Sequence, residues 1–169
     1  EKGIFNGGLG SITKDFRSMQ YFSCPNQFIA TGNSNHNGFK YGLTWMAYRP
    51  IHETECCIGN LHRYMPNYVA RMWLKDKKGH PVAALYGPSS VVYDLGEGVT
   101  VKIDEITEYP FEEQIKFKFT FFKDGKRSNE SHAMDFTYRI PGWCKAAEAG
   151  FRTESKEWKS GEVFTVRLP

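Results

Sequence analysis

Residues 115–121 read IKFKFTF, and this stretch decides the fold class. Its odd-numbered positions are apolar, and its even-numbered positions are Lys or Thr. Successive side chains of a β-strand point to opposite faces, so this alternation gives the strand one apolar face and one polar face. Such a strand is typical of an antiparallel sheet with one face in water. The stretch therefore predicts a mainly β fold.

Further strands are predicted on both sides of this stretch. They are short apolar runs separated by turn signals such as KDGK (residues 123–126) and KSGE (residues 159–162). The predicted strands are Val82–Tyr86, Ser90–Asp94, Val99–Ile106, Ile115–Phe122, Met134–Ile140 and Val163–Leu168. This spacing predicts an antiparallel β-sandwich. We interpret CKAAEAGFRTESKEW (residues 144–158) as a short connection in which residues are missing.

One helix is predicted, and it begins at the adjacent cysteines Cys56 and Cys57. From there apolar residues recur at spacings of three and four as far as Met72, which indicates an amphipathic helix. Thr54 is a candidate N-cap, and Pro66 is expected to kink or break the helix. Residues 1–52 are rich in Gly and Asn, and they predict turns and short strands such as Ser18–Phe22, without a helix.

Composition and charge favour some partners over others. The chain has 169 residues and a net charge of +3, and its 22 basic residues are scattered along the sequence. A nucleic-acid or membrane-surface binder would gather them into a patch, so we expect neither partner. No apolar run approaches the roughly 20 residues that span a bilayer. The chain begins at Glu1 without Met, and we expect it to be a piece of a longer protein.

The adjacent cysteines are the main candidates for chemistry. The positive end of a helix dipole favours the thiolate form, and Cys binds zinc only as the thiolate. His52, Glu53 and Glu55 are nearby residues of metal-ligand type. An inert buried pair is the alternative, because free Cys is among the most buried residue types.

The histidines are weaker candidates for a functional site than the cysteines. His80 and His132 are predicted to lie in turns and to be solvated, and His62 lies within the predicted helix.

Five motifs, taken in order, resemble glycoside hydrolase family 127, the β-L-arabinofuranosidase family. They are FNGGLGSITKDFRSMQYF (5–22), CC-x-x-N-x-x-R (56–63), EITEYPFEEQIKFKF (105–119), YRIPGWC (138–144) and EWKSGEVFTVRLP (157–169). The resemblance covers nearly the whole chain but only the C-terminal part of the family's length. It implies that residues 1–73 are the incomplete C-terminal part of an (α/α)6 barrel catalytic domain. Residues 74–169 would then form the β-sandwich domain.

The resemblance also implies a mechanism. Cys56 would be the nucleophile of a retaining glycosidase and a zinc ligand, Cys57 would be a second zinc ligand, and Tyr21 would line the sugar pocket. The remaining ligands, which include a Glu-x-Cys pair, and the acid/base glutamate would lie in the missing N-terminal barrel portion. The substrate would be a carbohydrate, and this chain alone would be inactive. Two alternatives remain open: a non-catalytic carbohydrate-binding or structural β-sandwich, and a redox-sensing thiol pair.

Overall fold

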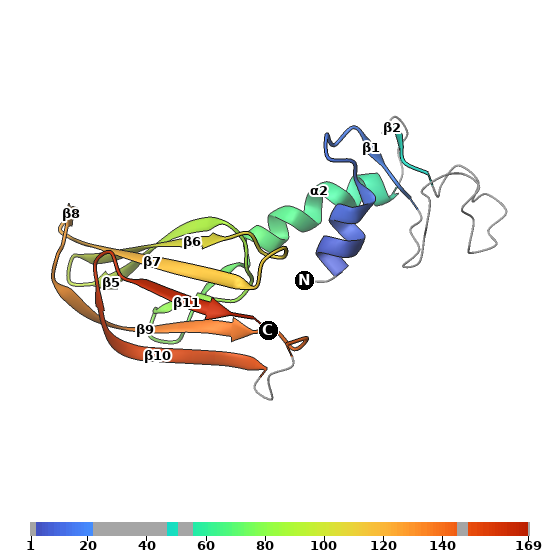
Figure 1. The fold of residues 1–169 in the computed structure, drawn as a ribbon. Coiled ribbons are helices and arrows are strands. Elements are labelled where there is room, and N and C mark those ends of the chain that lie inside the picture. The colour runs from blue at the N-terminus through green and yellow to red at the C-terminus, as the bar shows by residue number, and fades with distance from the viewer. Residues whose placement is uncertain (1–2, 22–46, 51–55, 145–148, 169) are drawn as a thin grey trace. The chain divides into compact units, whose positions relative to one another are not determined.

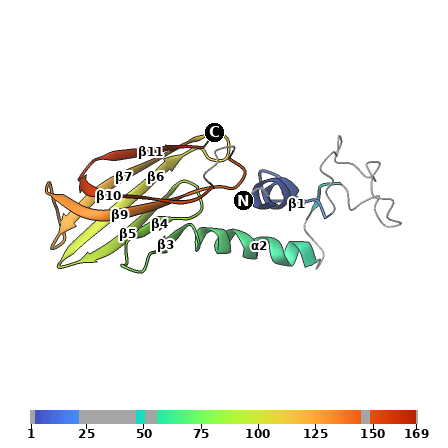
Figure 2. The ribbon, with the colours of Figure 1, turned by 90° about the horizontal axis from the view of Figure 1, so that it is seen from below.

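The structure is a computed structural model that describes residues 3–21, 47–50, 56–144 and 149–168. Contacts within the chain divide it into two compact units, Glu1–Tyr68 and Val69–Pro169. Figures 1 and 2 show the ribbon in two views.

The second unit consists of two sheets. One has the strand order β10-β9-β4-β3, and the other has the order β11-β7-β6-β5 with β8 paired to β7. All neighbouring strands are antiparallel except β4 and β9, which are parallel. The strands are β3 (Trp73–Lys75), β4 (Pro81–Ala83), β5 (Ser89–Gly96), β6 (Val99–Thr107), β7 (Gln114–Lys123), β8 (Lys126–Arg127), β9 (Ser131–Ile140), β10 (Gly150–Lys159) and β11 (Val163–Arg167). The predicted mainly β, antiparallel sandwich is confirmed.

The core of the sandwich is aromatic. Phe117 and Phe119 on β7 are both fully buried, as the alternation in IKFKFTF predicts. The ring centroid of Phe117 lies 4.9 Å from that of Phe136 on β9, and the centroid of Phe119 lies 4.4 Å from that of Trp158 on β10. These ring pairs join the two sheets. Aromatic side chains remove the largest apolar areas from water, so they contribute most to the stability of the unit.

One predicted turn signal joins two paired strands, and the other joins the two sheets. Asp124 and Gly125 connect β7 to β8 with φ angles of 49° and 77°. This is the conformation that a two-residue hairpin loop requires, and Asp-Gly is one of the dipeptides that adopt it readily. Gly161, with φ of 91°, lies in the turn between β10 and β11.

β10 corrects the interpretation of residues 144–158 as a connection. It pairs with β9 over ten residues, from Gly150 opposite Ile140 to Lys159 opposite Ser131. The stretch RTESKE within it lacks an apolar face, because β10 is an edge strand and most of its side chains are exposed. The following Trp158 is its fully buried core residue. Periodicity alone therefore misses this strand.

The first unit contains short elements and one longer helix. A π-helix (η1, Gly3–Gly8) leads into a 3₁₀ turn (η2, Leu9–Ser11), and β1 (Ser18–Met19) pairs with β2 (Arg49–Pro50). The prediction that residues 1–52 contain no helix is therefore wrong. Packing against α2 explains η1. Gly8 lies so close to Tyr64 that a Cβ atom on it would be 2.5 Å from the ring carbon Cζ. The ring centroid of Phe5 lies 5.6 Å from that of Tyr68. Tertiary contacts with the helix α2 stabilise η1 rather than intrinsic propensity.

The longer helix, α2, spans Cys56–Val69 and begins at the cysteine pair, as the sequence predicts. The break expected at Pro66 does not occur: the helix continues for three residues beyond the proline. Proline removes one backbone hydrogen bond and disturbs the preceding turn, and here it stands in the last turn, where little helix follows. None of the helices within the described ranges has the length and the apolar composition needed to cross a bilayer.

Candidate functional site

The cysteine pair occupies the first two positions of α2. The first N–H groups of a helix have no partner within the helix, and the positive end of the dipole lies there. No acidic residue lies in the first turn of α2 to offset that potential. This backbone position is one at which negative charge is favoured in general. Thr54, His52, Glu53 and Glu55 lie outside the described residues.

Tyr21, the predicted sugar-pocket residue, is half-buried and follows β1 by two residues. In the β1–β2 pair, Ser18 lies opposite Pro50 and Met19 lies opposite Arg49. The structure therefore brings the segment before Tyr21 beside the segment that leads to the cysteines. The roles of Tyr21, Cys56 and Cys57 stay predictions.

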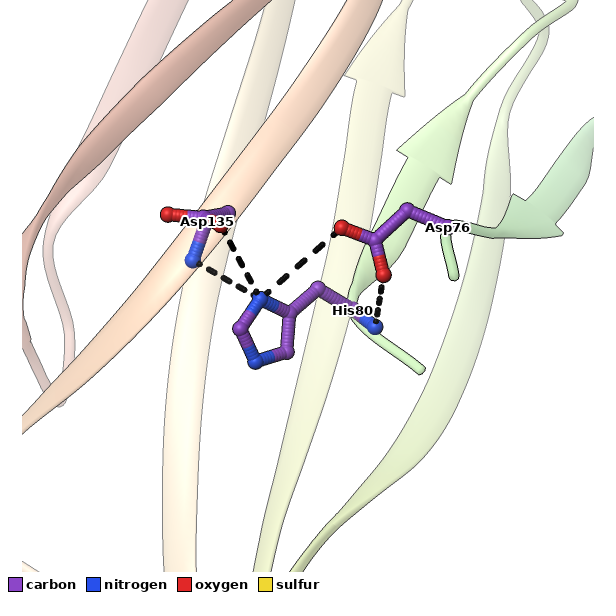
Figure 3. Close-up of side chains that lie close together, drawn as sticks. All are labelled: Asp76, His80 and Asp135. Carbon is purple, nitrogen blue, oxygen red and sulfur yellow. Dashed lines mark hydrogen bonds and ion pairs between the residues drawn. The ribbon is translucent and has the colours of Figure 1, made fainter. Parts of the chain in front are cut away.

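A triad of possible metal ligands lies in the second unit. Asp76, in the turn after β3, His80, just before β4, and Asp135, on β9, converge as Figure 3 shows. His80 Nδ1 lies 3.5 Å from Asp135 Oδ2 and 4.0 Å from Asp76 Oδ2. One imidazole nitrogen and two carboxylates are a donor set that divalent metal ions accept.

Local hydrogen bonds hold the triad in place. Asp76 Oδ1 accepts the backbone N–H groups of Lys78 and His80, each at 2.8 Å. His80 is the residue just before β4, and its Nδ1 accepts a hydrogen bond from the backbone N–H of Asp135 on β9 at 3.3 Å. The Lys78 ammonium group, 2.9 Å from Asp135 Oδ2, lowers the pKa of the Asp135 carboxyl to about 2, with help from Ser155.

Sequence reasoning missed this triad. The turn position of His80 is confirmed, but the ring is half-buried and is paired rather than simply solvated. The spacing of Asp76 and His80 within one turn was the available signal, whereas Asp135 is remote in the sequence. His132 is not in a turn. It lies on β9, is half-buried, and its ring centroid is 4.9 Å from that of Phe121.

Glu105 on β6 is a buried carboxyl in the second unit. Its two oxygens accept the N–H of Gly87 at 3.1 Å and the hydroxyl of Ser89 at 3.0 Å. The indole Nε1 of Trp73 donates to that same hydroxyl at 3.0 Å. Burial raises the pKa of Glu105 to about 8, although both hydrogen bonds act in the opposite direction. Glu105 also lines a surface depression of about 380 Å³ together with Glu108 and Glu112.

Comparison with known proteins identifies part of the chain. Residues 82–161 match the family model described as "Beta-L-arabinofuranosidase, GH127 middle domain". This range of 80 residues, a little under half of the chain, is similar to the GH127 middle domain. The resemblance to glycoside hydrolase family 127 is therefore confirmed, and the portion that contains this domain is β-L-arabinofuranosidase-like.

Solved structures agree with this assignment at the level of the fold. A GH127 β-L-arabinofuranosidase from Geobacillus stearothermophilus T6 superposes with a TM-score of 0.67 at 17% identity, over 98% of this chain and 26% of that one. A second GH127 β-arabinofuranosidase gives a TM-score of 0.63 at 17% identity, over 98% of this chain and 27% of that one. The chain therefore spans about a quarter of the length of these structures. None of the curated proteins compared with the chain matches it.

The GH127 middle domain contains Glu105 and Asp135 but none of the residues predicted for catalysis. Cys56, Cys57 and Tyr21 all precede the matched range of 82–161. The family assignment thus rests on the sandwich, and the predicted chemistry belongs to the other unit.

Proposed function

We propose that this chain is a portion of a retaining, β-L-arabinofuranosidase-like glycoside hydrolase. The match of residues 82–161 to the GH127 middle domain carries the proposal. The position of the cysteine pair at the start of α2 supports it. In this proposal residues 1–73 close a helical-barrel catalytic domain, and residues 74–169 form the sandwich.

Cys56 is proposed as the nucleophile. Retention of configuration needs one group that attacks the anomeric carbon and a second group that protonates the leaving oxygen. The thiolate of Cys56 would form a bond to that carbon while the bond to the leaving oxygen breaks. The start of a helix suits this role, because unpaired N–H groups stabilise negative charge there. The acid/base group would come from the preceding barrel portion, and Tyr21 would line the sugar pocket.

Zinc is proposed as the cofactor. Two adjacent thiols fit half of a tetrahedral zinc site, so Cys56 and Cys57 would hold the ion with two ligands from outside this chain. When bound, the ion supplies positive charge that keeps the thiols ionised near neutral pH. The substrate would be a carbohydrate, and the chain alone would be inactive because its site is incomplete.

The alternative is a non-catalytic carbohydrate-binding or structural sandwich. One observation favours it: the family match covers the sandwich and leaves out every predicted catalytic residue. In that case the cysteine pair would be an inert part of the other unit.

The test compares the 169-residue chain with the longer protein that the proposal requires. Both are assayed on p-nitrophenyl β-L-arabinofuranoside, and their zinc content is measured. We expect activity and stoichiometric zinc in the longer protein, and no activity in the chain alone. Cys56→Ala in the longer protein should lower kcat/KM by about 10³-fold or more, as removal of a nucleophile does.

Cys144→Ala is the matched control, since Cys144 is buried in the second unit and has no proposed role in catalysis. This variant should retain activity and zinc. An active Cys56→Ala variant would refute the nucleophile, and a longer protein without zinc or activity would favour the alternative.

A further inference from the structure

The triad of Asp76, His80 and Asp135 has no part in the proposed function. We propose that it binds one divalent first-row transition-metal ion and that the ammonium group of Lys78 competes with this ion. The inference does not depend on the glycosidase proposal, because all four residues lie in the second unit.

The spacing of the donor atoms suits a metal ion. With metal–ligand distances of about 2.1 Å, neighbouring donors of a tetrahedral or octahedral ion lie roughly 3.0–3.5 Å apart. His80 Nδ1 is 3.5 Å from Asp135 Oδ2 and 4.0 Å from Asp76 Oδ2, and the three donors all lie within 4.8 Å of one another. A small contraction of the triad would therefore complete one face of a coordination shell.

The ligands are already ordered. Asp76 is fixed by the two backbone N–H groups that its Oδ1 accepts, while its Oδ2 faces His80. Asp135 projects from the middle of β9, and His80 directly precedes Pro81, whose ring restricts the backbone of the preceding residue. The side chains of Asp76, His80 and Asp135 are only 27%, 25% and 19% exposed. Metal binding would thus cost little additional conformational entropy.

A bound ion would replace the Lys78 ammonium group at Asp135 and the backbone N–H of Asp135 at His80. The Lys78 ammonium lies 2.9 Å from Asp135 Oδ2, so it neutralises the carboxylate that the ion needs. The Lys78 side chain is 70% exposed, and its ammonium can therefore move into water at low cost. The N–H of Asp135 would also have to release His80 Nδ1. These exchanges limit affinity, and removal of Lys78 should raise it.

The donor set narrows the class of ion. Ca²⁺ and Mg²⁺ take oxygen ligands, whereas an imidazole nitrogen suits first-row transition metals. Two carboxylates favour a harder ion of that series, with water in the remaining positions. Mn²⁺ is the suitable probe, since the soft thiols of Cys56 and Cys57 prefer other metals.

The experiment titrates the 169-residue chain with Mn²⁺ and measures the free ion by electron paramagnetic resonance. We expect one ion to bind with a Kd of about 0.1 mM or tighter. Amide NMR signals of residues 76–80 and of Asp135 should broaden first. Asp76→Asn keeps an oxygen acceptor for the two N–H groups, and it should weaken binding at least 10-fold while the fold is retained.

Lys78→Met should tighten Mn²⁺ binding at least threefold, because the competing charge is gone. The matched control is Lys102→Met, since Lys102 forms a similar surface pair with Asp104 at 2.6 Å, and it should leave the Kd unchanged. Failure to bind at 1 mM Mn²⁺, or binding that Asp76→Asn does not weaken, would overturn the site. An unchanged or weaker affinity in Lys78→Met would overturn the competition.

Discussion

At the residue scale, Glu105 places an ionisable group on the core face of β6. Val101 and Ile103 share that face, and both are fully buried. The alternation along β6 therefore identifies Glu105 as an inward-facing residue, although it cannot identify the polar partners. Gly87 lies between β4 and β5, and Ser89 is the first residue of β5, so only the pairing of β5 with β6 brings these two partners to the carboxyl group.

The raised pKa of Glu105 sets a pH dependence of stability. The folded protein keeps this proton up to pH about 8, whereas the unfolded chain releases it near 4.5. The contribution of Glu105 to stability is therefore fully present below pH 4.5 and decreases as the pH rises to 8, by up to about 5 kcal/mol. Glu105→Gln stays neutral, so its melting temperature should fall less between pH 5 and pH 8.5 than that of the unmodified chain.

Thermal unfolding followed by circular dichroism at several pH values would measure this difference. Glu112→Gln is the matched control, since Glu112 is exposed, and its pH profile should follow that of the unmodified chain. Parallel profiles for Glu105→Gln and the unmodified chain would show that Glu105 does not titrate in this way.

At the element scale, the turns fix the register of the second sheet. Gly98 joins β5 to β6 with φ of 75°, and a Cβ atom there would lie 2.3 Å from Asp124 Oδ1 in the neighbouring β7–β8 turn. Glycine is therefore required both by the backbone conformation and by the close approach of a second turn.

Gly98→Ala should lower the free energy of unfolding by roughly 1–3 kcal/mol. Urea denaturation would measure the loss. Gly142→Ala is the control, because a Cβ atom at Gly142 would meet no atom within 4 Å, and its effect should stay within about 0.5 kcal/mol. In an Asp124→Ala background only the φ strain remains, so part of the loss should be recovered. Equal stability of the two glycine variants would contradict this account.

The elements differ in whether sequence patterns alone can predict them. β7 is recognisable because its two faces differ in polarity, and α2 because its apolar residues recur at helical spacing. β10 is not recognisable, since an edge strand needs few apolar residues, and η1 exists because Tyr64 and Tyr68 pack on it. The cysteine pair could be found from the sequence because its two residues are adjacent. The Asp76–His80–Asp135 triad could not, because only the pairing of β4 with β9 brings Asp135 to the other two residues.

At the scale of the whole molecule, stability should depend on the aromatic core between the sheets. Phe119 is fully buried against Trp158, whereas Phe111 is 90% exposed in the loop before β7. Phe119→Ala should reduce the free energy of unfolding by about 3–5 kcal/mol, because it leaves a cavity. Phe111→Ala, the same chemical change on the surface, should cost less than about 0.5 kcal/mol.

Urea unfolding followed by tryptophan fluorescence would measure both variants, since Trp158 lies in the core. Similar costs for the two substitutions would mean that the inter-sheet aromatic contacts do not determine the stability of this unit.

The parallel pairing of β4 with β9 governs the order in which the sandwich can be completed during synthesis. Strands β5, β6 and β7 follow one another along the chain and pair in that sequence, so their sheet can begin to form as they leave the ribosome. β4 has β3 as its early partner, and its second neighbour is supplied by residues 131–140. β4 therefore stays at the edge of a two-stranded pair until residues 131–140 have been synthesised, whereas β6 has both of its neighbours once β7 has emerged.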